Sequence, residues 1–350
     1  MLTRRPGLTI VELLVIVIVI FLLVPLCIPG GVGGRERARQ ATCMNNVRQL
    51  AKAQQFCIER DRSAAFSGFL QPRSELRSGK QAARSASDET FVAWPTRILP
   101  HLEQIELHKA IVENRDGGGF ADGVPPFIEV FQCPSDPQVD PSAPALSYVV
   151  NSGMPDLVEA SEDHPSDLRA NGVCHDQRPG RFGPKFRLMD IKDGQDRTLL
   201  LSENVQRDPP GTANQPGNTW LRPAKDAINL EQWYGMVWIV DEQNPRAPRT
   251  ELMERFNHDS RPEGEWDQPY AASGTRFARP ASEHPEVFNV AFCGGNVKEI
   301  HQDIDYAVYQ QLMTPDGAKA APADAPDQRF EKTLPDDQRF MNPPLTDADY

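Results

Sequence analysis

The first hydrophobic feature of the chain is a continuous apolar run near its start. Residues 13–24 are all Leu, Val, Ile or Phe, and the apolar segment continues from Leu8 to Ile28. About 20 apolar residues are enough to cross a bilayer as a helix. We therefore expect a transmembrane helix over 8–29. Arg4 and Arg5 precede it, and the positive-inside rule keeps that end in the cytoplasm and places the rest outside.

Beyond this run the hydrophobic pattern becomes amphipathic. A helix predicted over 35–62 carries one repeating face, made of Val47, Leu50, Ala51, Gln54 and Ile58. Residues 63–87 are rich in Ser, Gly and Arg and predict a loop. A second, shorter helical pattern over 94–112 contains a helix-breaking proline, Pro100.

The second half of the chain has the pattern of short strands. Apolar or alternating runs occur at 127–131, 147–150, 197–201 and 287–292, each bounded by turn residues. A last helix is predicted over 303–313. The expected fold class is therefore α+β, in which a long N-terminal transmembrane and amphipathic helix precedes a head dominated by antiparallel β-sheet.

Composition adds boundaries to this pattern. A Gly-rich segment at 30–34 predicts a hinge, and the head then extends over 35–313 with a Trp- and Pro-rich insertion at 205–280. From 314 to 350 the chain consists largely of Pro, Ala, Asp and Gln, which predicts a disordered tail. The length of 350 residues fits one large head with an insertion as well as it fits two domains.

The charge and proline content exclude several classes of protein. The chain has 37 Lys and Arg against 49 Asp and Glu, a net charge of -12, which argues against a nucleic-acid partner. The 32 prolines argue against a coiled coil or simple helical bundle. The mean hydropathy of -0.51 is that of a soluble protein, so the apolar run is the exception to be explained.

Two ordinary interpretations of the apolar run are a cleaved secretory signal and a plain signal anchor. A secretory signal requires a small-residue cleavage site, and residues 26–30 (LCIPG) match it poorly. Neither interpretation explains Glu12. A carboxylate inside an apolar helix is costly and calls for a partner, which makes Glu12 a candidate functional residue.

Residues 7–14, GLTIVELL, resemble the prepilin-type cleavage and methylation leader of type IV pilins and type II secretion pseudopilins. The resemblance implies that a prepilin peptidase cuts after Gly7 and methylates Leu8. Glu12 would then be the fifth mature residue, where its carboxylate can pair with the new ammonium group. The chain departs from the commoner pattern in having Leu8 in place of Phe. Pro25, Pro29 and the glycines also interrupt the expected continuous helix.

The exported part resembles a bacterial family of unknown function that carries this leader and a large β-rich head. Its ordered motifs match at 37–50 (RARQATCMNNVRQL), 94–104 (WPTRILPHLEQ), 131–137 (FQCPSDP), 147–153 (SYVVNSG), 193–204 (DGQDRTLLLSEN) and 284–293 (HPEVFNVAFC). Gly294 stands where the family has Asp. The resemblance implies a pilin-like head and an envelope location rather than an activity.

Five cysteines lie outside the apolar run, in a part of the chain expected to be exported. Cys43 and Cys57 are too far apart on one helix to pair. Because Cys43 and Cys133 both lie in motifs of the family, the resemblance implies a disulfide between them. The sequence has no C-x-x-C pair, which argues against zinc or redox chemistry.

Two other groups of residues are candidates for binding a ligand. Asp190, Asp193 and Asp196 surround a glycine and are a weak candidate for Ca²⁺, although an Asp-Gly turn explains them better. Four tryptophans of the insertion are candidates for stacking on a sugar, although buried anchors are the commoner role of such residues: Trp220, Trp233, Trp238 and Trp266.

A hydrolase triad is a further alternative. It would combine His258 and Asp259, or His284, with Ser202 or Ser282. The sequence has no Gly-x-Ser-x-Gly elbow, and chance explains these residues better. We therefore predict no catalytic residue and no cofactor other than the weak Ca²⁺ candidate.

Taken together, these features predict a non-enzymatic, pseudopilin-like component of the cell envelope. It would be anchored by a single pass in the inner membrane, with its head periplasmic or at the cell surface. Its partners would be prepilin peptidase, membrane lipid and pilin-like subunits or secretion machinery. The two rivals are a tethered module that binds a carbohydrate or another solute, and an envelope hydrolase.

Overall fold

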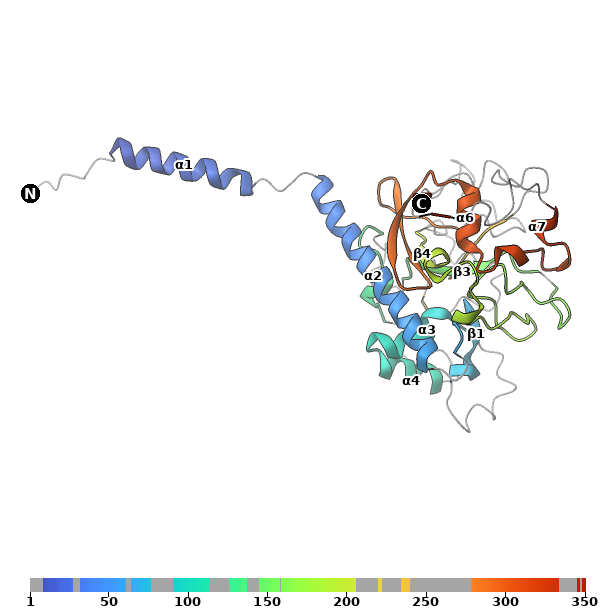
Figure 1. The fold of residues 1–350 in the computed structure, drawn as a ribbon. Coiled ribbons are helices and arrows are strands. Elements are labelled where there is room, and N and C mark those ends of the chain that lie inside the picture. Colours follow the sequence, from blue (N-terminus) through green and yellow to red (C-terminus); the bar gives the residue numbers. More distant parts are fainter. Residues whose placement is uncertain are drawn as a thin grey trace, which may run out of the picture.

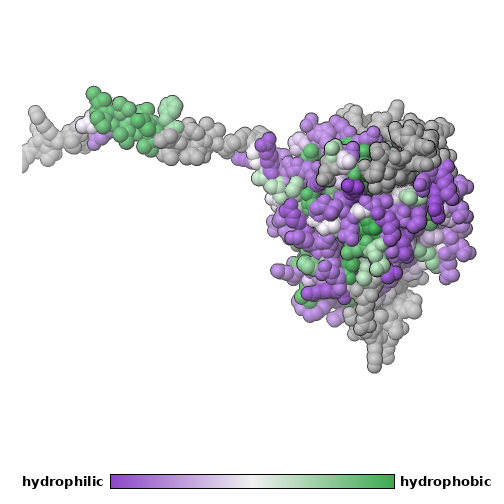
Figure 2. Space-filling model, in the orientation of Figure 1, coloured by the Kyte–Doolittle hydropathy of each residue, from purple (hydrophilic) through white to green (hydrophobic). Residues whose placement is uncertain are grey.

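The chain begins with a separate apolar helix in the computed structural model. The structure describes residues 9–27, 32–60, 64–76, 91–113, 126–136, 145–157, 159–205, 220–221, 234–239, 278–333, 345–346 and 348–350. Helix α1 (Ile10–Cys27) lies within the predicted 8–29 segment, and its side chains from Ile10 to Phe21 are exposed (Figures 1 and 2). Among the described residues, no helix combines the length and the apolar character that crossing a membrane requires.

The second helix, α2 (Val32–Arg60), packs one face against the head. The predicted face is confirmed, because Val47, Leu50, Ala51, Gln54 and Ile58 are all buried. The start of α2 corrects the predicted hinge at 30–34. Gly33 and Gly34 belong to the first turn of the helix, and residues 30 and 31 lie outside the described residues.

A mixed five-stranded sheet forms the centre of the head. Its strands follow the order β5 (Gly235–Val237), β3 (Tyr148–Gly153), β4 (Leu199–Glu203), β6 (Val287–Phe292) and β7 (Val297–His301). All neighbours are antiparallel except β3 and β5, which are parallel. In the register of the three central strands, Val149 lies opposite Ser202, and Ser202 lies opposite Val290. The described residues thus form a mixed α and β fold.

The sheet is covered on both faces, which explains why β3 and β4 are buried along their whole length. Tyr148 and Val150 belong to the core cluster that contains the buried face of α2. Val149 and Val290 belong to a second cluster, which contains the buried hydrophobic residues of α6 (Tyr306–Met313). Since neighbouring strand residues point to opposite faces, α2 and α6 lie on opposite sides of the sheet (Figure 1).

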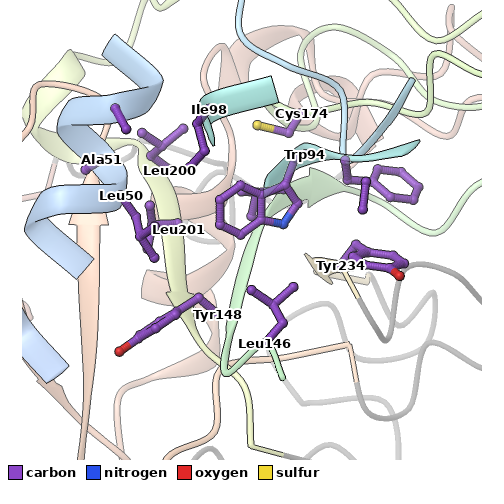
Figure 3. Close-up of a cluster of buried hydrophobic side chains, with 14 of the residues drawn as sticks. Leu50, Ala51, Trp94, Ile98, Leu146, Tyr148, Cys174, Leu200, Leu201 and Tyr234 are labelled. Atoms are coloured by element: carbon purple, nitrogen blue, oxygen red, sulfur yellow. The ribbon is translucent and has the colours of Figure 1, made fainter. Parts of the chain in front are cut away.

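Trp94 occupies the centre of the larger core cluster. Figure 3 shows its indole ring between Ile98, Leu200 and Leu146, with Tyr148 and Tyr234 on either side. The ring also meets the ring of Phe131 edge-on, at 6.4 Å between centroids. Trp94 is the first residue of α3 (Trp94–Ile98), and Pro95 is well placed in the first turn of this helix, where its missing N–H costs nothing.

Smaller elements complete the head. A two-stranded antiparallel sheet joins β1 (Leu70–Pro72) to β2 (Phe91–Ala93). The remaining short helices are η1 (Arg73–Leu76), η3 (Leu99–Leu102), α4 (Ile105–Glu113), η4 (Glu129–Phe131), η5 (Leu188–Asp190), η6 (Gln195–Arg197), η8 (Gly317–Lys319) and α7 (Phe330–Thr333).

Three sequence predictions are corrected by these elements. The run at 127–131, expected as a strand, contains the 3-10 helix η4. The loop expected over 63–87 contains β1 and η1, and it buries Phe66 and Phe69 in the core.

The third correction concerns the tail expected to be disordered from 314 onward. Its described residues pack against the head. Ala320 and Ala321 are fully buried, and the ring of Phe330 lies 5.9 Å from that of Trp238. The C-terminal Tyr350 contacts Phe292 on β6, with 5.6 Å between ring centroids. Apolar anchors spaced along a polar segment are sufficient to dock it.

Candidate functional site

Side chains from four separate segments meet where α2 crosses the sheet. Glu36 and Cys43 come from α2, and Cys133 follows η4. Glu203 is the last residue of β4, and His284 precedes β6. We call these five residues the junction cluster. All but Glu36 are buried, and the Glu36 side chain is 22% exposed.

The helical period explains why α2 supplies two members. Glu36 and Cys43 are seven residues apart, which is close to two turns and places both on the same side of the helix. Glu36 lies near the solvent-exposed end of α2, and Cys43 begins its buried face. The helix therefore brings a charge and a sulfur atom to the same edge of the sheet.

A disulfide joins Cys43 to Cys133 and so links α2 to the turn that follows η4. The turn after Cys133 is held by its own hydrogen bonds. The Asp136 amide donates to the Cys133 carbonyl at 2.9 Å. The Ser147 hydroxyl donates to Asp136 Oδ2 at 2.6 Å and accepts from the Cys133 amide at 3.1 Å. The disulfide therefore ends in a turn that is itself tied to Ser147, the residue that precedes β3.

His284 lies between two carboxylates and the disulfide. Its Nδ1 is 2.8 Å from Glu36 Oε1, and its Nε2 is 3.3 Å from Glu203 Oε1. The same Nε2 is 3.5 Å from Cys133 Sγ. The doubly protonated imidazolium can therefore donate to Glu36 through Nδ1 and face Glu203 through Nε2. In this form it links α2 to the strand β4.

The surroundings shift the pKa values of two members in opposite directions. Burial acts to lower the pKa of His284, but Glu203 and then Glu36 outweigh it, so the pKa lies above the ordinary 6.5. Burial acts to raise the pKa of Glu36, but bonds with Ser135 and His284 outweigh it, so that pKa lies below the ordinary 4.5. The Ser135 hydroxyl donates to Glu36 Oε1 at 2.6 Å. Both shifts favour the charged pair.

Glu203 is fully buried, and its two oxygens differ. Oε2 accepts hydrogen bonds from the Asn289 amide at 2.8 Å and from Asn289 Nδ2 at 3.2 Å. Oε1 has no hydrogen-bond partner and points toward His284 Nε2. The nearby Glu203 charge, after burial, contributes to raising the pKa of the Tyr148 phenol well above 10. A buried carboxylate therefore presents one oxygen to the imidazole and the sulfur atoms.

The motifs quoted for the family resemblance meet at this cluster. Cys43, Cys133, Glu203 and His284 each belong to a different motif, and Ser147 belongs to a further one. A family profile described as "protein of unknown function (DUF1559)" matches residues 33–307, more than half of the chain. The chain belongs to the DUF1559 family. No curated protein and no solved structure matches the chain.

The DUF1559 match contains the whole junction cluster, from Glu36 on α2 to His284 before β6. It begins after α1, so the leader-like segment lies outside it. Gly7 and Leu8 lie outside the described residues, while Glu12 is described. Its carboxylate accepts hydrogen bonds from the Thr9 amide and the Thr9 hydroxyl, both at 2.9 Å. The Glu12 amide donates to Thr9 Oγ1 at 3.3 Å, completing a capping box.

The tryptophan candidates do not form a sugar-stacking surface among the described residues. Trp220 and Trp238 are fully buried. Their indole nitrogens donate to the carbonyls of Pro126 and Asn171, at 3.0 and 2.7 Å. They anchor the core instead. Trp233 and Trp266 lie outside the described residues.

The three aspartates proposed for Ca²⁺ have separate local roles. Asp190 Oδ2 accepts from the Arg187 amide at 2.9 Å and caps η5. Asp193 Oδ2 accepts from the Gly317 amide at 2.6 Å and so fastens the C-terminal segment to the head. The carboxylate of Asp196 lies where a Cβ at Gly294 would be. Among the described residues, the side chains suited to a metal gather at the junction cluster instead.

The serines proposed for a hydrolase triad are hydrogen-bonded to backbone. The Ser202 hydroxyl donates to the Asn289 carbonyl at 3.1 Å, and the Ser282 hydroxyl donates to the Val287 carbonyl at 2.7 Å. The imidazole nitrogens of His284 face carboxylates. His258 and Asp259 lie outside the described residues. Among the described residues, these two hydroxyls therefore hold neighbouring segments of the head together.

Sequence reasoning identified Cys43 and Cys133 but did not place Glu36, Glu203 and His284 beside them. Two signals were available. Glu36 lies at helical spacing from Cys43, and Glu203 lies two residues after the apolar run 199–201. Neither signal names the partner, because Glu36 and His284 are 248 residues apart in the chain.

Proposed function

We propose that this chain is a membrane-anchored, pseudopilin-like structural or assembly component of the cell envelope, processed and N-methylated by a prepilin peptidase. It would be non-enzymatic, with a pilin-like head outside the inner membrane. The observation that carries the proposal is the combination of the leader motif at 7–14 with the exposed apolar surface of α1.

The surface of α1 supports an anchoring or assembly role. Its large apolar side chains from Ile10 to Phe21 are between 45% and 80% exposed, and Figure 2 shows them as a continuous hydrophobic surface. A contiguous apolar surface of this kind is unfavourable in water and marks a contact with lipid or with other apolar helices. The head is largely hydrophilic on the face shown in the same figure.

The junction cluster supports the structural part of the proposal. A structural component anchored through α1 needs a firm link between the helix that follows the anchor and the head. Here the helix that follows α1 is joined to the head by a disulfide and by the Glu36–His284 pair. A buried disulfide also fits an oxidising compartment outside the cytoplasm. Neither rival, the solute-binding module or the hydrolase, gains an observation from the described residues.

The capping box allows a sharp test of Glu12. A capping role requires only an acceptor at position 12, and glutamine also serves in capping boxes. Pairing with a neighbouring N-terminal ammonium requires the negative charge. The variant Glu12→Gln keeps the cap and loses the charge, whereas Thr9→Ala loses the Thr9 part of the cap and keeps the charge.

The experiment is in vivo crosslinking followed by co-purification of the full chain, carried out for wild type, Glu12→Gln and Thr9→Ala. We expect the wild type and Thr9→Ala to crosslink to further copies or to other pilin-like subunits, and Glu12→Gln to lose this product. Equal assembly of Glu12→Gln and wild type would contradict the role of the charge. Absence of any assembly product in the wild type would contradict the assembly proposal.

A further inference from the structure

The junction cluster holds more than a disulfide and an ion pair. Four of its members, Cys43, Cys133, Glu203 and His284, place one ligand atom each within 4.8 Å of all the others, and all four are buried. Two sulfurs, one imidazole nitrogen and one carboxylate oxygen form a donor set that suits Zn²⁺. Their spacing along the sequence matches no zinc motif, because they come from four segments.

We propose that the reduced form of this cluster is a Zn²⁺ site, with Cys43 Sγ, Cys133 Sγ, His284 Nε2 and Glu203 Oε1 as the four ligands. The disulfide and the metal ion are then alternative occupants of the same place. The inference goes beyond the proposed envelope function and does not depend on it. It states what holds α2 to the head when the disulfide is not formed.

The geometry needs little change at two of the ligands. In a tetrahedral zinc site the ligand atoms are about 3.3–3.8 Å apart, given metal–ligand distances of about 2.0–2.3 Å. His284 Nε2 already lies 3.3 Å from Glu203 Oε1 and 3.5 Å from Cys133 Sγ. The main movement is the separation of the two sulfurs once the bond between them is broken. Rotation of the Cys43 side chain on α2 can supply it.

The groups behind the ligands also fit a zinc site. A zinc-bound histidine usually donates its other N–H to a carboxylate, which orients the ring. Here His284 Nδ1 lies 2.8 Å from Glu36 Oε1. Glu203 is oriented in the same way, because Asn289 donates two hydrogen bonds to Oε2. Oε1, the oxygen without a hydrogen-bond partner, is the one left to bind the ion.

The exchange of occupants balances in atoms and charge. A dithiol reductant supplies two electrons and two protons to the Cys43–Cys133 bond, which yields two thiols, and the reductant becomes a disulfide. Binding of Zn²⁺ then displaces both thiol protons and the Nε2 proton of the imidazolium into solvent. The ion takes over the role of the imidazolium as the positive charge that faces the buried Glu203. The reduced cluster without metal keeps the imidazolium but lacks any link between Cys43 and Cys133.

The test uses the full chain purified in detergent and titrated with Zn²⁺ or with Co²⁺ as a spectroscopic probe. A phosphine replaces the dithiol as reductant: it takes the oxygen of water and becomes an oxide, and the two water protons go to the thiols. We expect one equivalent of metal per reduced chain and none per oxidised chain. Co²⁺ should give thiolate charge-transfer bands and the intense visible bands of a tetrahedral ion. Zinc should also protect Cys43 and Cys133 from alkylation, as read by peptide mass analysis.

Matched variants separate this site from adventitious binding by thiols. Cys174→Ala removes a buried free thiol outside the cluster and should bind Zn²⁺ as the wild type does. Glu36→Gln should weaken Zn²⁺ binding by about 10–100-fold, as loss of a group that orients a ligand does. His284→Gln and Glu203→Gln should weaken it further and change the Co²⁺ spectrum.

Three results would overturn the proposal. One is a reduced wild-type chain that retains its circular dichroism and binds no Zn²⁺. Another is a Co²⁺ spectrum that is the same in wild type and His284→Gln. Reduction that unfolds the wild type, with no refolding when Zn²⁺ is added, also counts against it, because a metal at this place must stabilise the fold.

Discussion

Helices α1 and α2 follow each other in the chain but meet their surroundings in opposite ways. α1 is apolar around its circumference, and its large side chains from Ile10 to Phe21 are exposed. α2 is polar on one side and buries the other against β4, β6 and β7. The free energy that orders α2 therefore comes from within the chain. The exposed apolar surface of α1 has no such contact among the described residues.

The difference also shows where the chain places its polar stabilising contacts. At α1, Glu12 and Thr9 satisfy each other within one turn. At α2, Glu36 is bonded to Ser135 and His284, which are distant in sequence. A local cap stabilises a helix without fixing its position, whereas distant contacts fix a helix on the head. The cap of α1 therefore stabilises the first turn of that helix without tying it to the head.

The largest expected effect on the contrast between α1 and α2 comes from removal of the disulfide. The double variant Cys43→Ser and Cys133→Ser opens a link between residues 90 positions apart. We expect the unfolding free energy of the head to fall by about 4–5 kcal/mol, because the unfolded chain loses a long closed loop. Urea denaturation followed by tryptophan fluorescence measures it. The control is Val15→Ser on α1, where the side chain is 54% exposed, and it should leave the transition unchanged.

Core truncation gives the next largest effect. Leu50→Ala on α2 removes a fully buried side chain between the helix and the sheet and should cost the head about 3 kcal/mol. Leu14→Ala on α1, where the residue is 55% exposed, should change head stability by less than about 0.5 kcal/mol. The same denaturation experiment compares them. Similar losses in both variants would mean that α1 packs on the head after all.

The dependence of head stability on pH sharpens the role of the charged pair. The pKa of folded His284 lies above 6.5, so its contribution is complete below that value and is lost as the pH rises through the folded pKa. The pKa of folded Glu36 lies below 4.5, so its contribution is present above 4.5 and is lost as the pH falls through the folded pKa. The stabilisation by the pair should therefore be greatest between these two values.

The measurement is the unfolding free energy of the oxidised head as a function of pH, in wild type and in His284→Gln. The wild type should lose stability on the alkaline side of 6.5, and the variant should have a flatter profile there. Glu203 faces the same imidazole and remains in both proteins. A wild-type profile identical to that of the variant would show that His284 is not charged in the folded head.

The smallest effect concerns the cap of α1. Thr9→Ala should weaken the first turn of α1 by about 1 kcal/mol, which corresponds to about fivefold faster amide exchange there. Hydrogen exchange in detergent, resolved by mass spectrometry, measures it. The exchange of α2 should stay unchanged, because no head contact is altered. Faster exchange in both helices would indicate that the two are coupled.

Local periodicity accounts for what the sequence predicted well. The buried face of α2, from Val47 to Ile58, follows from the 3.6-residue repeat alone. Strands β4 and β6 follow from apolar runs in the sequence. Such runs occur there because both faces of the sheet are covered. In contrast, β5 has three residues, and its parallel pairing with β3 depends on residues more than 80 positions away, so no local pattern announces it.

The candidate site was predictable in part. The family motifs singled out Cys43 and Cys133, which form a disulfide in the structure. The approach of Glu36, Glu203 and His284 depends on how α2 crosses the sheet, which is a tertiary property. For the C-terminal segment the sequence prediction was wrong. Its composition predicted disorder, yet Phe330 and Ala320 are buried against the head.

The most direct test of the proposed function is the intact mass of the native protein purified from its membrane. A pseudopilin-like chain should have lost residues 1–7 and carry one methyl group on Leu8, giving an amino terminus that places Glu12 at the fifth position. A mass equal to that of the uncut chain, or a cut at any other place, would contradict the proposal.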